Sequence, residues 1–550
     1  MAWTELLWVA AALLALLYLF VTSNNKFFVE KRLPYRRPIP LLGNMGPLVF
    51  KKKNLALLSQ EFYHQFKSFG MGGIFHFRKP VLVICEPEVV RQLCIREHEN
   101  FVDDNAVATE DGDGLFHKSI LAHSGARWRD LRATLSPAFS SGRLAAMVPL
   151  VGKCAQRLVL QLGEACVNHV AGGGADEPLA VELREVMARA VGEATAAAAF
   201  GVGGSGSGGA GVQELLAAGA EAADPRGRRA LYTLAHALAP GLAEVLDMQI
   251  VRPETQEYFR SLVHAAVRAH EVGTPAAGAG AEAERADALH LLVAGRQGNL
   301  RSLDTDEELA ARAPLHSGAH KAQNIVAQLS DDDITAQVLL FFLSGFETTC
   351  TLLSFLGYVL AVHPHVQERA RREVEEALED GHTLTYEALK KMKYLDMVIS
   401  ETLRMYPPTP VAARKCTHTF AVLGTKKRSG FVVRPGDTLW LPIYALHNDP
   451  ELFPDPDKFD PERFSQANEP HAVPFSYLPF GAGPRSCIGM QFAMMEVKVI
   501  TAYLLSRFHI KAIDKTPVPL KLTKGSCQMT TDEGFWVGLE PRTAARHIQV

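Results

Sequence analysis

A short loop near the C-terminal end constrains the fold of this chain more than any other stretch. Phe480–Gly489 reads Phe-Gly-Ala-Gly-Pro-Arg-Ser-Cys-Ile-Gly and precedes an apolar stretch that predicts a helix from about Met490. Its three glycines permit backbone conformations that are closed to other residues, so the loop can bring Cys487 close to a large flat partner. The amides at the helix N-terminus and the neighbouring Arg485 would favour a thiolate at Cys487. Without further context, a lone cysteine in a glycine turn would be interpreted as an ordinary buried cysteine.

The spacing of the loop changes that interpretation. The complete pattern Phe-x-x-Gly-x-Arg-x-Cys-x-Gly resembles the haem-binding loop of the cytochrome P-450 superfamily. The resemblance implies that Cys487 is the axial thiolate ligand of haem b (iron protoporphyrin IX), with Phe480 and Arg485 in the cofactor site. It also implies a mainly α single-domain fold with a small β part, in which haem lies between a long central helix and the cysteine loop.

The overall composition is that of an ordinary globular protein with a full core. Hydrophobic residues make up 47% of the chain, charged residues 21%, and the formal net charge is −3. This balance gives no reason to expect nucleic acid as a partner. The eight cysteines contain no CxxC pair and have no even spacing, which indicates a reducing compartment without a disulfide framework or a zinc cluster.

The N-terminal stretch predicts a membrane anchor. From Leu6 to Val21 every residue is apolar or tyrosine, although about 20 residues are needed to span a bilayer. A cleaved signal peptide is disfavoured, because the stretch lacks a basic flank before it and a small-residue cleavage site after it. Basic residues follow directly, so the bulk of the protein is expected in the cytosol. The anchor and the absence of an Arg-rich presequence favour the endoplasmic reticulum membrane. The sequence therefore predicts an anchor over 1–24, a basic proline-rich hinge over 25–50 and a catalytic domain over 51–550.

A long apolar stretch from Ile334 to about Val362 predicts the central helix, capped by Asp331–Asp333. A second transmembrane span is the alternative. Glu347 and Thr348 in the middle of the stretch argue against it, because an unpaired carboxylate in lipid is costly.

The middle of this helix carries a second motif. Ser344–Thr349 reads Ser-Gly-Phe-Glu-Thr-Thr and resembles the oxygen-activation motif of the same superfamily. The resemblance implies that Thr348 and Glu347 are the catalytic alcohol and acid that steer protons into the site. The motif usually begins with Ala or Gly, so Ser344 departs from the pattern and can alter the polarity of the pocket.

Two sets of arginines extend the resemblance over nearly the whole chain. Trp128 and Arg132 are four residues apart and share one helical face, and in the family this pair donates to the haem propionates. Arg414 matches a further propionate-binding position. A structural triad of the family, required for folding and haem retention, is matched by Glu401, Arg404 and Arg463.

Some stretches are ambiguous. Gly201–Gly206 satisfies GxGxxG, but no strand precedes it and the surroundings to Gly211 are of low complexity, so a flexible linker is expected. Leu231–Ile250 is apolar enough to cover a pocket or to contact the membrane. By position in the family, a lipophilic pocket is expected to be formed by Asp103–Ala122, Leu231–Ile250, Phe341–Ser344, Thr409–Ala412 and Thr530–Phe535.

The resemblance, which is nearest to insect microsomal xenobiotic-metabolising members, implies a membrane-bound monooxygenase acting on lipophilic small molecules. The chain has no credible flavin or nicotinamide site, so electrons are expected from NADPH through an FAD/FMN flavoprotein, NADPH–cytochrome reductase, with cytochrome b5 as a further donor. Basic residues such as Arg129 and Lys415 would receive the acidic surface of that partner. Two alternatives remain: a haem-thiolate isomerase or dehydratase, which commonly lacks the Glu-Thr pair, and a non-enzymatic haem sensor on the same fold.

Overall fold

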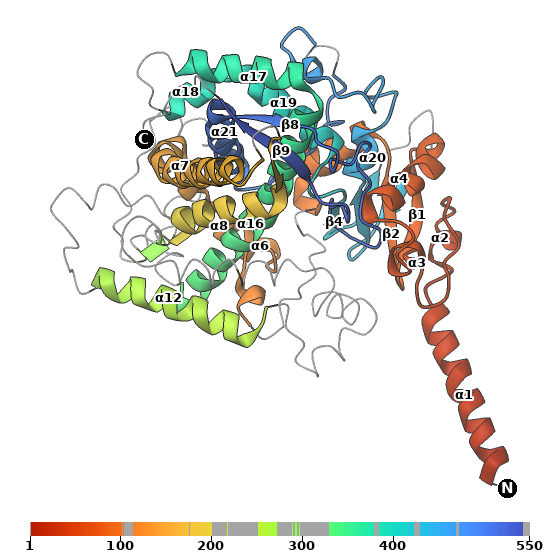
Figure 1. Ribbon diagram of the computed structural model, residues 1–550. Coiled ribbons are helices and arrows are strands. Elements are labelled where there is room, and N and C mark those ends of the chain that lie inside the picture. The colour runs from red at the N-terminus through yellow and green to blue at the C-terminus, as the bar shows by residue number, and fades with distance from the viewer. Residues whose placement is uncertain are drawn as a thin grey trace.

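In the computed structural model a long helix, α16 (Asp331–Val362), runs through the helical body of the protein (Figure 1). The structure describes residues 2–101, 103, 114–174, 177–200, 217, 251–271, 289, 292–293, 296, 329–378, 384–422, 430–468 and 472–542. Within these ranges the chain is mostly helical with small sheets, as the sequence predicted. The expected linker at Gly201–Gly211 and the apolar stretch Leu231–Ile250 lie outside them.

The start of α16 is set by a capping box. The Ser330 hydroxyl accepts from the Asp333 backbone N–H, and the Asp333 carboxylate accepts from the Ser330 backbone N–H. The sequence had assigned the cap to the three aspartates, but the N-cap residue is Ser330. Asp332 instead binds Arg260 of α12 (Pro253–Glu271) at 2.9 Å, which ties that helix to α16.

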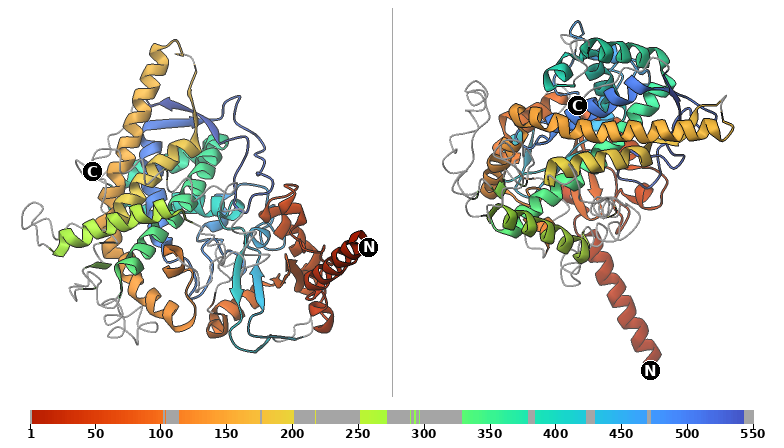
Figure 2. Two further views of the ribbon diagram at one scale, coloured as in Figure 1. Left: turned by 90° about the horizontal axis from the view of Figure 1, so that it is seen from below. Right: turned by 60° about the vertical axis from the view of Figure 1, so that its left-hand side comes forward.

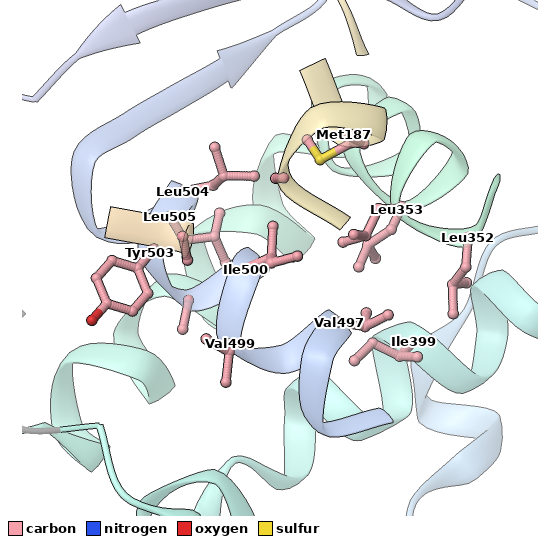
Figure 3. Close-up of a cluster of buried hydrophobic side chains, with 14 of the residues drawn as sticks. Met187, Leu352, Leu353, Ile399, Val497, Val499, Ile500, Tyr503, Leu504 and Leu505 are labelled. Atoms are coloured by element: carbon pink, nitrogen blue, oxygen red, sulfur yellow. The ribbon is translucent and has the colours of Figure 1, made fainter. Parts of the chain in front are cut away.

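Four helices pack around a shared core. Figure 3 shows this cluster, to which α8 (Leu183–Phe200), α16, α19 (Lys393–Met405) and α21 (Met490–Arg507) each contribute fully buried side chains. Because each buried aliphatic side chain contributes about 1.5–3 kcal/mol, this packing fixes α16 relative to α21 and to the loop that precedes it. The labelled members include Met187, Leu353, Ile399, Val497 and Ile500.

The small sheets join distant parts of the chain. A hairpin is formed by β1 (Met71–His76) and β2 (Lys79–Ile84), which pair antiparallel. β2 pairs parallel with β7 (Thr438–Leu441), and β7 pairs antiparallel with β4 (Ala412–Lys415). A second sheet has the order β3 (Leu179–Glu182), β9 (Trp536–Pro541), β8 (Phe508–Lys511), and a third consists of β5 (Phe420–Val422) and β6 (Phe431–Val433).

The N-terminal helix α1 (Ala2–Thr22) projects away from the body in every view (Figures 1 and 2). Both α1 and α16 are long and apolar enough to cross a membrane. However, 72% of the relevant window of α16 is buried inside the protein and only 6% of that of α1. The segment after α1 packs on β1, because the Arg36 backbone N–H donates to Gly73 O at 2.9 Å and Phe28 is fully buried.

The other described helices complete the body. They are α2 (Phe27–Glu30), α3 (Gly46–Val49), α4 (Leu55–Phe66), α5 (Pro87–Arg91), α6 (Gly125–Leu135), α7 (Ser141–Ala171), α17 (Pro364–Ala377), α18 (Tyr386–Lys391) and α20 (Ile443–His447), with a π-helix η2 (Gln92–Arg96) and 3-10 turns η1 (Lys67–Phe69), η3 (His98–Phe101), η4 (Leu115–Lys118), η5 (Ser136–Phe139) and η7 (Pro461–Phe464).

Candidate active site

A cavity lies between α16 and the cysteine loop, where the two main sequence motifs meet. It encloses about 1150 Å³ of empty space, including the solvent at its open side. Cys487 lines it from the loop, and Ser344 and Thr348 line it from α16. Most of the remaining wall is apolar and includes Leu121, Phe139, Ala198, Ala199, Phe341 and Phe492.

The loop has the strained turns that its glycines predicted. Gly481 and Gly483 have φ values of 74° and 73°, which favour glycine. A Cβ at Gly483 would also lie 1.9 Å from the Cys94 carbonyl oxygen, so the loop rests directly against η2. The Cys487 backbone N–H donates to the Phe480 carbonyl at 2.9 Å. Phe480 therefore closes the loop through its backbone, while its ring packs against the helical core.

Cys487 is surrounded by protein but exposed to the cavity. Burial raises the pKa of its thiol above the ordinary value, and a hydrogen bond from the Gly489 backbone N–H and the positive charge of Arg132 only partly offset this. The sequence had assigned the favourable charge to Arg485. In the structure it comes from Arg132.

The predicted cofactor-binding side chains of α6 lie together beside Cys487. Arg132 donates to the Ser486 carbonyl at 2.8 Å and has no carboxylate partner among the described residues. The Arg485 guanidinium lies 4.1 Å above the Trp128 ring and donates to the His123 carbonyl at 2.8 Å. The Trp128 side chain is buried in the wall, and its indole N–H finds no acceptor in the described part of the chain.

Arg414 lies behind the loop, in β4. It donates to the Ala482 carbonyl at 3.4 Å and to its neighbour's carbonyl, Ala413 O, at 2.7 Å. Arg414 is not among the described residues that line the cavity. The Arg414 side chain therefore contacts the loop at a backbone carbonyl of the loop.

The two residues of the predicted catalytic pair point in different directions. The Thr348 hydroxyl donates to the Ser344 carbonyl at 2.7 Å, and Thr348 is exposed to the cavity. Glu347 is 8% exposed, and its Oε1 accepts from the Arg184 guanidinium of α8 at 2.7 Å. This follows from helix geometry, since adjacent residues are about 100° apart around the axis. Arg184 could not be predicted from the sequence, because its pairing depends on how α8 packs on α16.

A second carboxyl group behind the cavity was also missed. Glu496 on α21 is fully buried, and its Oε1 accepts a hydrogen bond from the Thr195 hydroxyl at 3.3 Å. Burial raises the pKa of Glu496 to about 8, against a smaller opposing effect of Thr195 and Thr349. The signal in the sequence was a lone acidic residue within the apolar run Met490–Leu505.

The structure brings the predicted triad together outside the cavity lining. Arg404 binds Glu401 through Nε and Nη2 at 2.8 and 2.9 Å, and both side chains are fully buried. Arg463 reaches the same carboxylate at 3.3 Å. Arg404 also donates to the His447 carbonyl at 2.9 Å, so the network joins α19 to α20.

Only part of the expected pocket wall is found in the cavity. Ile120 and Leu121, from Asp103–Ala122, and Phe341 and Ser344 line it. Residues 104–113 lie outside the described ranges. Thr409–Ala412 and Thr530–Phe535 are described but are absent from its lining.

Comparisons with known proteins agree with this arrangement. A family model described as "Cytochrome P450" matches residues 33–209 and 281–536. Cytochrome P450 9e2 of Blattella germanica is 38% identical over 537 residues, which cover 96% of each chain. Two proteins of Drosophila melanogaster, probable cytochrome P450 9f2 and cytochrome P450 9c1, are 30% and 31% identical over 96% and 99% of this chain and 97% and 100% of theirs.

The chain belongs to the cytochrome P450 family. The P450 is thus a haem monooxygenase, an oxidoreductase that resembles insect members of the family. The other two functions considered from the sequence, an isomerase or dehydratase and a sensor, are not favoured by any of these relatives.

The residues of the P450's cavity fit a haem-thiolate group. Cys487 is the thiol that faces the cavity from the loop, and its thiolate would be the ligand of the iron. The indole N–H of Trp128 and the guanidinium of Arg132 lie beside it without a carboxylate partner in the described ranges. Such donors suit the two carboxylates of a porphyrin.

Proposed function

We propose that this P450 is a membrane-anchored haem-thiolate monooxygenase that uses NADPH, through a flavoprotein reductase, to insert one atom of O2 into a lipophilic small molecule. The observation that carries the proposal is the position of Cys487 across an apolar cavity from the hydroxyl groups of α16. The apolar wall selects lipophilic guests, since a polar guest would lose hydrogen bonds to water on entry.

In this proposal each residue of the cysteine side has a defined task. Cys487 binds the iron of haem b, and the loop closed by Phe480 holds the thiolate in place. Trp128, Arg132 and Arg485 bind the propionates, and Arg414 supports the loop from β4. Haem iron with a thiolate ligand supplies the activation of O2. The buried triad Glu401–Arg404–Arg463 keeps the segments below the loop in register.

On the opposite wall, Thr348 presents its hydroxyl to the cavity and Glu347 is the acid that resupplies its proton. Because Glu347 is bound to Arg184 at 2.7 Å, this ion pair must open before the carboxyl group can turn toward Thr348. Arg184 therefore controls when the acid is available.

The N-terminal segment supplies the membrane attachment. Helix α1 is apolar and projects from the body, and the Arg78 guanidinium fixes its last turn by donating to the Phe20 carbonyl at 2.8 Å. Lys26, Lys31 and the following arginines favour a cytosolic body on the endoplasmic reticulum membrane. Arg129 and Lys415 are exposed and form part of the surface that receives the reductase or cytochrome b5.

The test is a reconstitution of the P450 with NADPH–cytochrome reductase, isotopically labelled O2 and a panel of lipophilic compounds. We expect NADPH-dependent products that carry one labelled oxygen atom, measured by mass spectrometry. Rearrangement of an organic peroxide without NADPH would instead indicate an isomerase or dehydratase. NADPH consumption no greater than that of the reductase alone, with any compound, would indicate a sensor.

A further inference from the structure

The residue at which the α16 motif departs from the family pattern lies in the cavity. Ser344 is exposed to it, one helical turn before Thr348 on the same face. The question is what its hydroxyl binds there. The answer deepens the proposed function, on which it rests, by naming a feature of the substrate.

Several other polar side chains of the cavity wall already have hydrogen-bond partners. Thr348 donates to the Ser344 carbonyl at 2.7 Å, and Thr195 donates to Glu496 at 3.3 Å. Arg132 donates to the Ser486 carbonyl and Arg485 to the His123 carbonyl. The Thr349 hydroxyl is buried and has no partner among the described residues. The Ser344 hydroxyl, which lies on the cavity wall formed by α16, has no hydrogen-bond partner among the described residues.

Other hydroxyls of the same helix satisfy themselves locally. Thr335 and Ser354 donate to the carbonyl four residues earlier, at 2.6 and 2.7 Å, in the same way as Thr348. Ser344 makes no such bond to the Leu340 carbonyl. Its donor is therefore available to a molecule in the cavity.

We propose that Ser344 determines substrate specificity, by donating a hydrogen bond to a neutral oxygen acceptor on a lipophilic substrate. A ketone, ester or ether oxygen fits, because the surrounding wall of Leu340, Phe341 and Ala199 would exclude the water that otherwise binds the hydroxyl. A carboxylate does not fit, since the cationic side chains of the lining, Arg132 and Arg485, lie on the Cys487 side.

The experiment measures equilibrium binding of two probes with one skeleton, the ketone menthone and the hydrocarbon p-menthane, by dialysis against the haem-loaded protein. Three variants are compared with the parent: Ser344→Ala and Ser344→Gly, which remove the hydroxyl, and Ser344→Thr, which keeps it. An unchanged carbon monoxide difference spectrum confirms that each variant retains the site.

We expect the parent to prefer menthone over p-menthane, relative to the partition of each probe between water and hexane. In Ser344→Ala and Ser344→Gly this preference should fall by about 2- to 10-fold, the usual net effect of one hydrogen bond, with p-menthane affinity unchanged. Ser344→Thr should retain it. An unchanged preference in Ser344→Ala, or an equal loss of affinity for both probes, would overturn the proposal. Failure of the parent to bind either probe would overturn the lipophilic substrate class itself.

Discussion

Two carboxyl groups are buried behind the cavity, and their surroundings are opposite. Glu347 on α16 has the Arg184 guanidinium 2.7 Å from Oε1. Glu496 on α21 accepts one hydrogen bond, from Thr195, and has no cationic partner within the described residues. Burial raises the pKa of Glu496 to about 8, so it holds a proton at neutral pH. The surroundings of a buried acid in this P450 are therefore set by the element that packs against it, and not by its own position in a motif.

The largest expected effect concerns the pH dependence of stability at Glu496. The pKa is 4.5 for an exposed glutamate and about 8 in the folded state. Between these values the folded state binds one proton more than the unfolded state, so the free energy of unfolding falls as pH rises, by up to about 1.4 kcal/mol per pH unit. Glu496→Gln has no carboxyl group to ionise at this position, so its free energy of unfolding should not show this fall. The difference in free energy of unfolding between the variant and the parent should therefore increase by several kcal/mol from pH 5 to pH 9 in urea-unfolding experiments.

Glu347→Gln is the matched control for that series. It removes the acid that binds Arg184, so it should be less stable than the parent. If the two variants show the same pH trend, the contrast between the two carboxyl groups is wrong.

The next effect should come from removing the partner of Glu347. Arg184→Leu leaves the carboxylate buried without a cation, which we expect to lower the free energy of unfolding by about 2–3 kcal/mol. This is less than for a fully buried pair, because 34% of the Arg184 side chain is exposed. Adding Glu347→Gln to Arg184→Leu should recover most of the loss, and Arg184→Lys should show little of it. Additive losses in the double variant would mean that the two side chains do not interact.

A smaller change in stability, but a marked one in function, is expected at Thr348. Thr348→Ala removes a hydroxyl that faces the cavity, so the haem spectrum should be retained while less product is formed per NADPH oxidised, with hydrogen peroxide in its place. Thr335→Ala is a suitable control, because Thr335 makes the same bond to the carbonyl four residues earlier but lies outside the cavity lining. An unchanged ratio of product to NADPH in Thr348→Ala would reject its role as the alcohol of the pair.

Deleting residues 1–24 should have the smallest effect on the stability that depends on the two carboxyl groups. Helix α1 is almost entirely outside the body, so the pH dependence of stability and the haem spectrum should match those of the full chain. Membrane attachment, measured by sedimentation with microsomes, should weaken. Loss of haem in the truncated protein would show that α1 belongs to the catalytic fold.

The sequence predicted those parts of the site that depend on local spacing. The Phe480–Gly489 pattern gave Cys487 and the start of α21, because glycine turns and apolar runs are short-range signals. The partners of these residues were not predictable in the same way. Arg184 reaches α16 and Thr195 reaches α21 only because α8 packs against both helices, and that packing is a long-range outcome of the whole core.

The cap of α16 illustrates the same limit at short range. Three consecutive aspartates at a helix start were reasonable capping residues, yet Ser330 is the N-cap. Asp332 is occupied with Arg260 and Lys118, which come from segments 72 and 214 residues away. The sequence predicted a helix that begins at Ile334, whereas α16 begins at Asp331, and the aspartates lie in its first turn.

The assignment of Cys487 as the thiolate ligand is tested most directly by the carbon monoxide difference spectrum of the reduced, haem-loaded protein. Cys527→Ser is the control, because Cys527 is the other exposed cysteine in the described part of the chain. We predict a thiolate-type spectrum in the parent and in Cys527→Ser, and its loss in Cys487→His whatever haem that variant retains. A thiolate-type spectrum at full intensity in Cys487→His would contradict the account.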